Sequence, residues 1–332
     1  MFYSLLKPLL FTMDAERAHE FSLKMLNRFQ VLLPQTQLYQ PTQVMGLEFP
    51  NPIGLAAGLD KNADFLSGLS KLGAGFIEVG TVTPRSQVGN PKPRLFRMAR
   101  HRGIINRMGF NNKGVDYLLK QLPPAPRPYR LGINIGKNLN TPVADALSDY
   151  QHCLEAIYTQ ADYISINISS PNTPGLRQLQ TEVALNHLLR GLYDTRKHMQ
   201  DTYQYDRPIV LKISPDLDEQ AIPGIAELLQ KYAIDGLIAT NTTLDRQSIG
   251  GEAENIPSGG LSGRPLCERS RHMLQAFYRQ LQDSIPIISV GGIDSPEEAQ
   301  LRFALGARLV QVYSGLIYEG PGLIQRIAKA LQ

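Results

Sequence analysis

Two short segments place polar side chains directly after apolar runs. They are GINIGKN at residues 132–138 and NISSPNTPGLR at residues 167–177. The second offers Asn167, Ser170 and Asn172, which are amide and hydroxyl groups without formal charge. In parallel α/β proteins, side chains just past the carboxyl end of a strand hold ligands. The pattern therefore predicts a flat, polar, hydrogen-bonding ligand at these strand ends.

A lysine inside an apolar run is a second chemical signal. Lys212 stands within PIVLKI at residues 208–213, where an unpaired ammonium would be costly to bury. We expect it to face an anionic or electron-rich partner. Polar or glycine residues also end the other apolar runs: Gly58, Asp60, Lys61, Thr81, Asn134, Thr240, Asn241, Thr242, Gly291, Gly292, Tyr313 and Ser314.

Glycines near the end of the chain suggest a phosphate site. VGGIDSPEEA at residues 290–299 and VYSGLIYEGP at 312–321 each put glycine in a turn after an apolar run. In barrels, the loops after the seventh and eighth strands are where backbone N–H groups bind phosphate. The position of these turns in a barrel makes a ligand that carries a phosphate about as probable as one that does not.

The elements that must position these residues alternate along the chain. Short apolar runs alternate with amphipathic stretches from residue 52 onward, which predicts a (β/α)₈ TIM barrel of the α/β class, closed by a helix at 320–331. Two insertions, 83–111 and 241–265, interrupt the alternation, and loops of that length are usually functional. The predicted strands lie within 53–57, 75–82, 130–136, 162–168, 208–213, 235–240, 286–292 and 308–314.

The first forty residues do not follow this alternation. They predict a two-helix extension over 1–40, preceding a barrel over 41–332, with an apolar helix at 2–13 and an amphipathic one after it. Packing against the barrel is the ordinary interpretation of such helices. The alternative is a membrane-surface or lipid-substrate element, because the leading helix is apolar nearly all round.

Composition excludes several classes of protein. The 332 residues carry a net charge of +4, too small and dispersed to suggest nucleic acid. The two cysteines lack the spacing of a metal site or a disulfide framework, so we expect no metal and a reducing, cytoplasmic setting. No apolar run reaches the roughly 18 residues that cross a bilayer. The six histidines lie away from the strand ends, and we expect them to be solvated.

As a set, the motifs resemble one family, the class 2, quinone-dependent dihydroorotate dehydrogenases. The similarity runs from about residue 43 to 322, and the helical extension also resembles that class. The motifs that carry it are NPIGLAAGLDKN, IEVGTVTPR, GNPKPRLFR, INRMGFNN, GINIGKN, INISSPNTPGLR, IATNTTLDR, GGLSGRPL, VGGIDS and VQVYSG.

The resemblance implies an FMN at the barrel mouth, in contact with dihydroorotate. It assigns the FMN phosphate to Gly263, Gly292, Tyr313 and Ser314, and the rest of FMN to Ala57, Gly58, Leu59, Asp60, Lys61, Thr81, Asn134, Asn167, Lys212 and Thr240. The substrate residues it implies are Lys61, Asn106, Arg107, Met108, Gly109, Phe110, Asn167, Asn172, Asn241 and Thr242.

It also implies the reaction, which is oxidation of (S)-dihydroorotate to orotate in de novo pyrimidine (UMP) biosynthesis. Ser170 occupies the position of the base, with a relay through water and Thr173 as a candidate path for its proton. Lys212 would stabilise negative charge on the flavin, and Lys61 would pair with the substrate carboxylate. Read without the family, Ser170 is an ordinary turn residue.

The resemblance further implies a membrane quinone as the electron acceptor. We expect a monomer that binds the cytoplasmic side of the cell (inner) membrane through its first helices. Two alternatives stay open: another FMN barrel oxidoreductase acting on a different small acid, and a membrane-surface binding module that keeps a flavin site without turnover.

Overall fold

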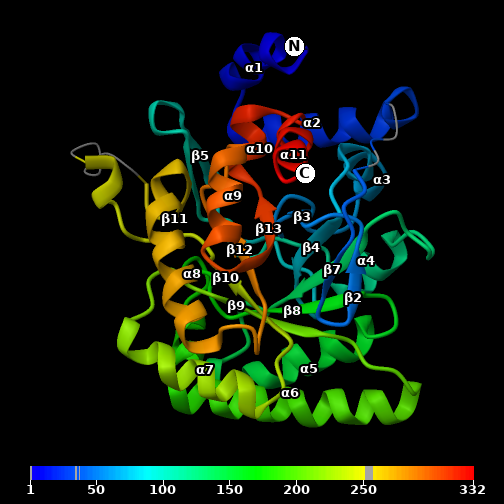
Figure 1. Cartoon of the computed structure of the whole chain (residues 1–332), viewed down its shortest axis with the longest axis vertical. Coiled ribbons are helices and arrows are strands. Elements are labelled where there is room, and N and C mark those ends of the chain that lie inside the picture. The colour runs from blue at the N-terminus through cyan, green and yellow to red at the C-terminus, as the bar shows by residue number, and fades with distance from the viewer. Residues whose placement is uncertain (1, 34–35, 37, 251–256) are drawn as a thin grey trace.

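Eight parallel strands close into a barrel in which each strand pairs with the next along the chain. The computed structural model describes residues 2–33, 36, 38–250 and 257–332 (Figure 1). Seven of the eight strands fall within the predicted runs and the last begins one residue earlier, at Ala307, so the (β/α)₈ barrel is confirmed. They are β3 (Ile53–Leu55), β4 (Phe76–Val82), β7 (Arg130–Ile135), β8 (Tyr163–Asn167), β9 (Ile209–Ile213), β10 (Gly236–Ala239), β12 (Ile287–Val290) and β13 (Ala307–Val312).

Helices cover the outside of this barrel. Every residue of β4, β8, β9 and β10 is buried, because the helices cover one face of the sheet and the barrel interior fills the other. Between β9 and β10 the expected amphipathic spacing is present, with Ile222, Ile225 and Leu229 buried. The helices are α3 (Leu66–Leu69), α4 (Val115–Gln121), α5 (Ala146–Ile157), α6 (Glu182–Tyr203), α7 (Ile222–Lys231), α8 (Cys267–Leu281), α9 (Pro296–Ala304), α10 (Ser314–Glu319) and α11 (Leu323–Ala330).

A small hairpin that we did not predict closes the amino end of the barrel. Its strands are β1 (Thr42–Val44) and β2 (Leu47–Phe49). The Phe49 ring meets the Phe76 ring edge-on at 5.4 Å between centroids and lies 6.5 Å from that of Tyr163. Aromatic side chains therefore fill the amino end of the barrel.

The two insertions come together in one three-stranded sheet. The first supplies β5 (Leu95–Met98) and β6 (Gly103–Asn106), and the second supplies β11 (Gly260–Gly263), which pairs with β6 in antiparallel register. Residues 251–256 of the second insertion lie outside the described residues. The insertions predicted as functional loops thus support each other.

The predicted helices of the extension are α1 (Phe2–Thr12) and α2 (Ala15–Arg28). The carboxylate of Asp14 caps α2 by accepting the Arg17 N–H at 3.0 Å. In Figure 1 both helices lie at one end of the molecule, beside α10 and β5. Lys7 donates to the Tyr318 carbonyl of α10 at 2.8 Å, and buried Glu16 pairs with buried Arg94 at 2.8 Å. The domain boundary at 40/41 stays a prediction.

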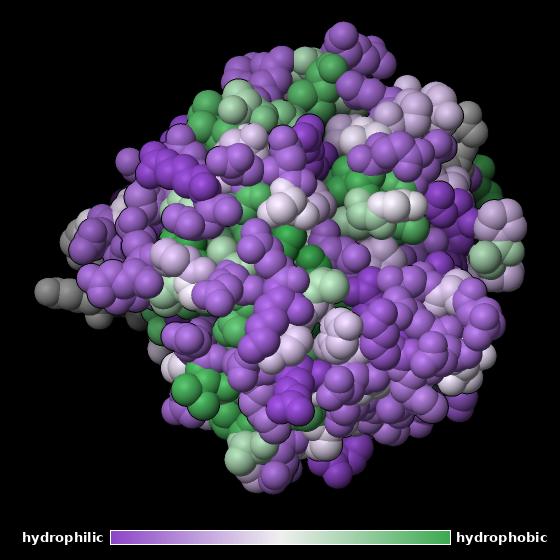
Figure 2. Space-filling model, turned by 60° about the horizontal axis from the view of Figure 1, so that its bottom comes forward, coloured by the Kyte–Doolittle hydropathy of each residue, from purple (hydrophilic) through white to green (hydrophobic). Residues whose placement is uncertain are grey.

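Apolar exposure is concentrated in this extension. Leu5 and Leu9 of α1 expose 74% and 65% of their surface, whereas Figure 2, which brings the opposite end forward, shows a mainly hydrophilic face with small apolar areas. Within the described part of the chain, none of the helices is both long and apolar enough to cross a membrane.

Candidate active site at the carboxyl end of the barrel

A pocket opens at the carboxyl end of the barrel strands, under the sheet formed by the insertions. It encloses about 1060 Å³, including the space open to solvent at its mouth. Strand ends and insertion strands both contribute to its lining, as the barrel prediction required. The predicted residues that line it are Ala57, Gly58, Lys61, Thr81, Asn106, Met108, Gly109, Phe110, Asn167, Ser170, Asn172, Lys212, Thr240, Asn241, Thr242, Gly263, Gly292, Tyr313 and Ser314.

The charged side chains that line the pocket are all positive. Lys61 and Lys212 line it, and none of the described lining residues is Asp or Glu. Lys61 is only half-buried by surface, yet protein atoms crowd its ammonium enough that burial lowers its pKa to about 8. Burial also lowers the pKa of Lys212, and the nearby Glu78 carboxylate opposes that shift. Such a pocket favours a ligand with negative charge.

An array of amides and hydroxyls forms part of the floor. The Thr81 hydroxyl donates to Asn134 Oδ1 at 2.5 Å, and Asn167 Nδ2 donates to Thr81 Oγ1 at 2.9 Å. Asn134 lies fully buried behind the lining, where its Nδ2 donates to Glu78 and Ser165, both at 2.9 Å. These bonds fix the orientation of the Asn167 amide.

Glu78 is a site residue that our sequence reasoning missed. Its buried carboxylate accepts from Asn134, from the Tyr163 hydroxyl at 3.0 Å and from Gln311 Nε2 at 2.8 Å. Gln311 lines the pocket, and its Oε1 has no hydrogen-bond partner among the described residues. The rule that singled out Lys212, a charge inside an apolar strand, would have found Glu78 in GFIEVGTV.

Glycines form a cradle on another side of the pocket. Gly263, Gly291 and Gly292 have φ values of 85°, 120° and 80°, which residues with a Cβ rarely adopt. A Cβ on Gly292 would stand 2.6 Å from the Cα of Cys267, so the loop packs closely there. The Ser314 and Ser262 hydroxyls lie 2.8 Å apart at the same edge. Backbone N–H groups and hydroxyls in this arrangement suit an anion.

Arg302 supports that cradle from behind, and our sequence reasoning did not identify it. It is fully buried, and its Nη2 donates to the carbonyls of Gly291 at 2.7 Å and Cys267 at 3.0 Å. Its Nε donates to Glu298 at 2.6 Å. An arginine four residues after a glutamate on a helix looks like a surface pair. Only the approach of α8 and the β12 loop buries it.

Ser170 occupies a turn and also faces the pocket. Its buried Oγ accepts the backbone N–H of Asn172 at 3.2 Å, so the turn interpretation describes part of its role. The hydroxyl proton remains available to another acceptor. Asn172 Nδ2 donates to Asn106 Oδ1 at 3.1 Å, which connects this loop to β6.

Four further predicted residues lie outside the lining, as Asn134 does. Leu59 is buried, and Asp60 accepts the backbone N–H groups of Asp64 and Phe65 while burial raises its pKa to about 6. Arg107 turns away and donates to the Pro93 carbonyl at 2.9 Å. Thr173 is buried, and its Oγ1 has no partner among the described residues.

The expectation that all histidines are solvated is wrong for His19. Burial and the positive charge of Lys61 lower the pKa of His19 to about 4, and its ring hydrogen-bonds the backbone of Leu59. α2 therefore lies close to the loop that carries Lys61. Helical periodicity alone could not show which residue of α2 faces the barrel mouth.

A closed barrel whose mouth combines a glycine cradle, an amide array and two lysines is the architecture of a (β/α)₈-barrel enzyme, with a pocket suited to an anionic ligand. A family model described as dihydroorotate dehydrogenase matches residues 39–332. The chain therefore belongs to the dihydroorotate dehydrogenase family, a family of flavin-dependent enzymes.

Several relatives are similar over the whole chain. A protein of Methylobacillus flagellatus named dihydroorotate dehydrogenase (quinone) is 50% identical, with all of both chains covered. One of the same name from Acinetobacter baylyi is 51% identical, also with all of both chains covered. Among solved structures, DHODH of Eimeria tenella in complex with ferulenol has a TM-score of 0.87 at 35% identity, covering 95% of this chain and 90% of that one.

Proposed function

We propose that this protein oxidises dihydroorotate to orotate with FMN as its flavin, and that a membrane quinone takes the electrons. The observation that carries the proposal is the lining of the pocket, which combines two lysines, a glycine cradle and no acidic side chain among its described residues. Relatives 50% identical over the full chain are named for this quinone-dependent activity.

FMN fits the donors of this pocket. Its phosphate suits the cradle of Gly263, Gly292 and Ser314. Gln311 Oε1 has no partner among the described residues and could accept an N–H group. When bound, the flavin supplies the hydride acceptor. The other lining residues proposed to hold it are Ala57, Gly58, Lys61, Thr81, Asn167, Lys212, Thr240 and Tyr313, with Leu59, Asp60 and Asn134 supporting them.

Dihydroorotate carries a carboxylate and two ring amides, which the remaining groups match. The Lys61 ammonium would pair with the carboxylate. Amide side chains would bind the ring edges, where an unpaired polar group would cost about 1–3 kcal/mol. The groups proposed to contact the substrate are Asn106, Met108, Gly109, Phe110, Asn167, Asn172, Asn241 and Thr242, with Arg107 outside the lining.

Proton removal falls to Ser170. The reaction takes a proton from substrate C5 and a hydride from C6, and the Ser170 oxygen is the base that we propose for C5. A serine hydroxyl acts as a base only if its own proton moves on. Thr173 has unused hydrogen-bonding capacity on its buried Oγ1, which supports a relay through water and Thr173. The Lys212 ammonium would stabilise the negative charge that develops on the flavin.

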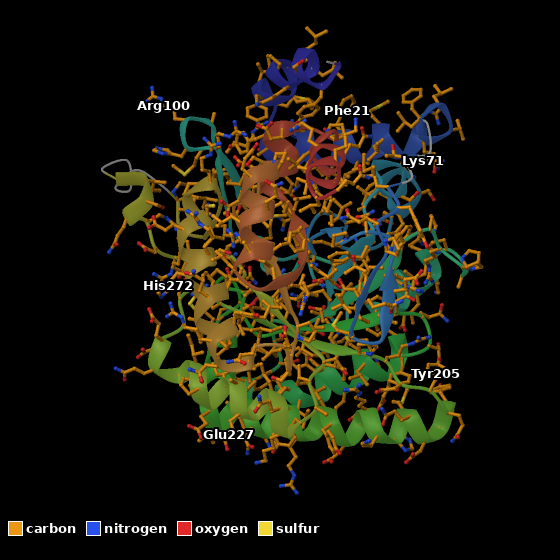
Figure 3. The ribbon with its side chains drawn as sticks, in the orientation of Figure 1. Phe21, Lys71, Arg100, Tyr205, Glu227 and His272 are labelled. Atoms are coloured by element: carbon orange, nitrogen blue, oxygen red, sulfur yellow. The ribbon has the colours of Figure 1, made fainter. Side chains whose placement is uncertain are left out.

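The extension is proposed to bind the membrane and admit the quinone. Exposed Leu5, Leu9 and Phe21 supply apolar surface at one end of the molecule. Figure 3 shows Phe21 and Arg100 at that end, with Glu227 and Tyr205 at the opposite one. We propose a monomer, peripheral on the cytoplasmic face of the inner membrane. Loss of vesicle binding on replacing Leu5 and Leu9 by serine would support this arrangement, and sedimentation would give the oligomeric state.

One anaerobic titration tests the activity. Dihydroorotate should bleach the absorbance of the bound flavin, and a soluble quinone should restore it. Lactate should leave the spectrum unchanged, because it offers no ring amides to the asparagines. If dihydroorotate left the flavin oxidised, the proposed function would be wrong, and bleaching by lactate would favour a different small-acid oxidoreductase.

A further inference from the structure

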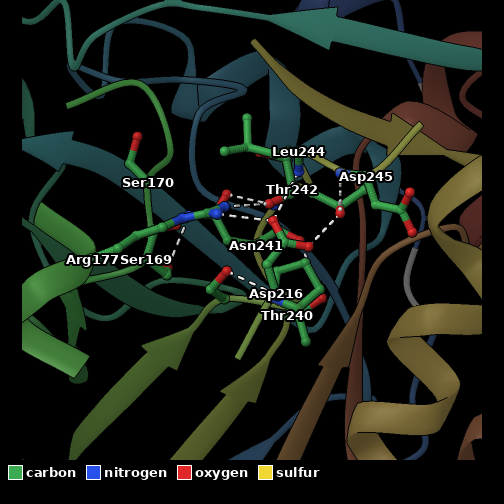
Figure 4. A network of polar contacts seen from close by, with 12 residues as sticks. Ser169, Ser170, Arg177, Asp216, Thr240, Asn241, Thr242, Leu244 and Asp245 are labelled. Carbon is green, nitrogen blue, oxygen red and sulfur yellow. Dashed lines mark hydrogen bonds and ion pairs between the residues drawn. The ribbon is translucent and has the colours of Figure 1, made fainter. Parts of the chain in front are cut away.

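One guanidinium joins two loops that carry proposed substrate groups. Arg177 follows the loop after β8, which bears Ser170, and its Nε donates to the Ser169 carbonyl at 3.2 Å. Its Nη2 donates to the Thr242 carbonyl, in the loop after β10, at 3.0 Å. Figure 4 shows the guanidinium between the two loops.

Asp216, in the loop after β9, completes the connection. Its Oδ2 accepts Arg177 Nη1 and the backbone N–H of Leu244, both at 2.8 Å, and its Oδ1 accepts the hydroxyl of Thr243. Arg269 lies 3.3 Å from the same carboxylate. Three successive barrel loops therefore meet at one ion pair.

Arg177 and Asp216 do not line the pocket themselves. The residues whose carbonyls accept from Arg177 either line it or are bonded to residues that do. Thr242 lines the pocket, and Asn241 Nδ2 donates to Ser169 Oγ at 2.9 Å on the pocket side. The Thr242 N–H donates to Asn241 Oδ1 at 2.8 Å. A shift of either loop would therefore move Asn241 and Ser170 relative to each other.

The Arg177–Asp216 ion pair should affect the position of the loops more than the stability of the protein. The Arg177 and Asp216 side chains expose 23% and 18% of their surface, and a partly exposed pair adds little to global stability because solvent screens it. The planar guanidinium, however, fixes the directions of its N–H groups, which lysine cannot reproduce. The main effect of the pair is therefore the placement of the loops.

We propose that Arg177 and Asp216 form a loop clamp that sets the position of the Ser170 loop against the Asn241–Thr242 loop. In this role both are positioning residues for substrate dehydrogenation and contact neither substrate nor flavin. The inference rests on the proposed function, because it assumes that these two loops enclose the substrate.

The test replaces Arg177 by alanine and by lysine in the full-length, flavin-loaded protein. Misplacing reacting groups by about 1 Å costs on the order of 10²-fold, so flavin reduction by dihydroorotate should slow roughly 10- to 100-fold. The orotate Kd, measured by calorimetry, should rise severalfold. Added guanidinium ion, far below concentrations that unfold proteins, should restore much of the rate in the alanine variant. The lysine variant should not recover it.

A matched control lies at the opposite end of the barrel. Arg130 also joins a carbonyl and a carboxylate, donating to Glu48 O at 2.6 Å and to Asp162 at 3.5 Å. The Arg130→Ala variant should reduce its flavin and bind orotate as the parent does. Equal losses in both variants would overturn the clamp, as would parental rate and orotate Kd in Arg177→Ala. A parent that dihydroorotate fails to reduce would instead overturn the proposed function.

Discussion

At the scale of single residues, the turn that holds Ser170 still allows its hydroxyl to act as a base. The Asn172 N–H fixes the serine oxygen, while the hydroxyl proton has no hydrogen-bond acceptor in the part of the chain that the structure describes. Ser170→Ala removes that oxygen together with the hydrogen bond that it accepts from the Asn172 N–H. We expect flavin reduction by dihydroorotate to slow roughly 10² to 10⁴-fold, the usual share of a positioned base. Stopped-flow bleaching measures this rate, and parental kinetics would exclude Ser170 as the base.

Lys61 should make orotate binding sensitive to pH. Burial lowers its pKa to about 8, so the ammonium that pairs with a carboxylate is present below that pH and is lost above it. The orotate Kd should therefore be constant below about pH 7 and should rise about tenfold per pH unit above about pH 8. Calorimetry across this range measures the change.

The matched variant for this titration is Lys61→Arg. Its guanidinium keeps its charge throughout the range, so the rise in Kd should disappear even though binding is weaker. A Kd in the parent that stays flat through about pH 10 would show that Lys61 does not bind the carboxylate.

At the scale of elements, α2 is attached to the insertion by a buried ion pair. Glu16 and Arg94 each expose 7% of their side chains, and three Arg94–Glu16 hydrogen bonds join them. Removing one partner of such a pair typically costs about 3–5 kcal/mol. Among the described residues, α1 forms no buried ion pair, and it is held by contacts such as that of Lys7 with α10.

Removing residues 1–40 should separate the two half-reactions. Dihydroorotate should still reduce the flavin, because the pocket is built from residues 56–315. Reduction of a membrane quinone should be lost. A shorter truncation, of residues 1–13, keeps Glu16 paired with Arg94. It therefore shows whether an effect of the longer truncation comes from the loss of that ion pair. Quinone kinetics unchanged in the longer truncation would defeat the role proposed for the extension.

At the scale of the whole molecule, the barrel orders its loops around one pocket, and a bound flavin should stabilise that arrangement. A ligand at 100 times its Kd adds about 2.7 kcal/mol. For a chain of this length, that should raise Tm by roughly 5 °C. Differential scanning calorimetry of the flavin-free protein with and without FMN measures the shift.

Riboflavin is the control for this stabilisation, because it lacks the phosphate that the cradle of Gly263 and Gly292 is proposed to bind. It should raise Tm less than FMN at equal concentration. Equal shifts would contradict the placement of the phosphate.

The sequence alone determined the order of the barrel strands and helices and most of the residues that line the pocket. Each barrel strand is an apolar run of limited length, and parallel strands bring their carboxyl ends to one mouth. The polar residues after those runs, such as Asn167 and Thr240, could therefore be assigned to one site from the sequence. The glycine turns after β12 and β13 were predicted for the same reason.

Only the tertiary structure decided which charged residues are buried and which loops touch. Arg302 looks like an ordinary helix-surface residue along the chain, because its burial depends on elements far apart in sequence. His19 meets Leu59 and Lys61 only because α2 packs beside the barrel mouth. Arg177 likewise reads as one more polar loop residue until the loops after β9 and β10 fold against it. Periodicity reports which face of an element is apolar, whereas the partner of a side chain is set by packing across the barrel.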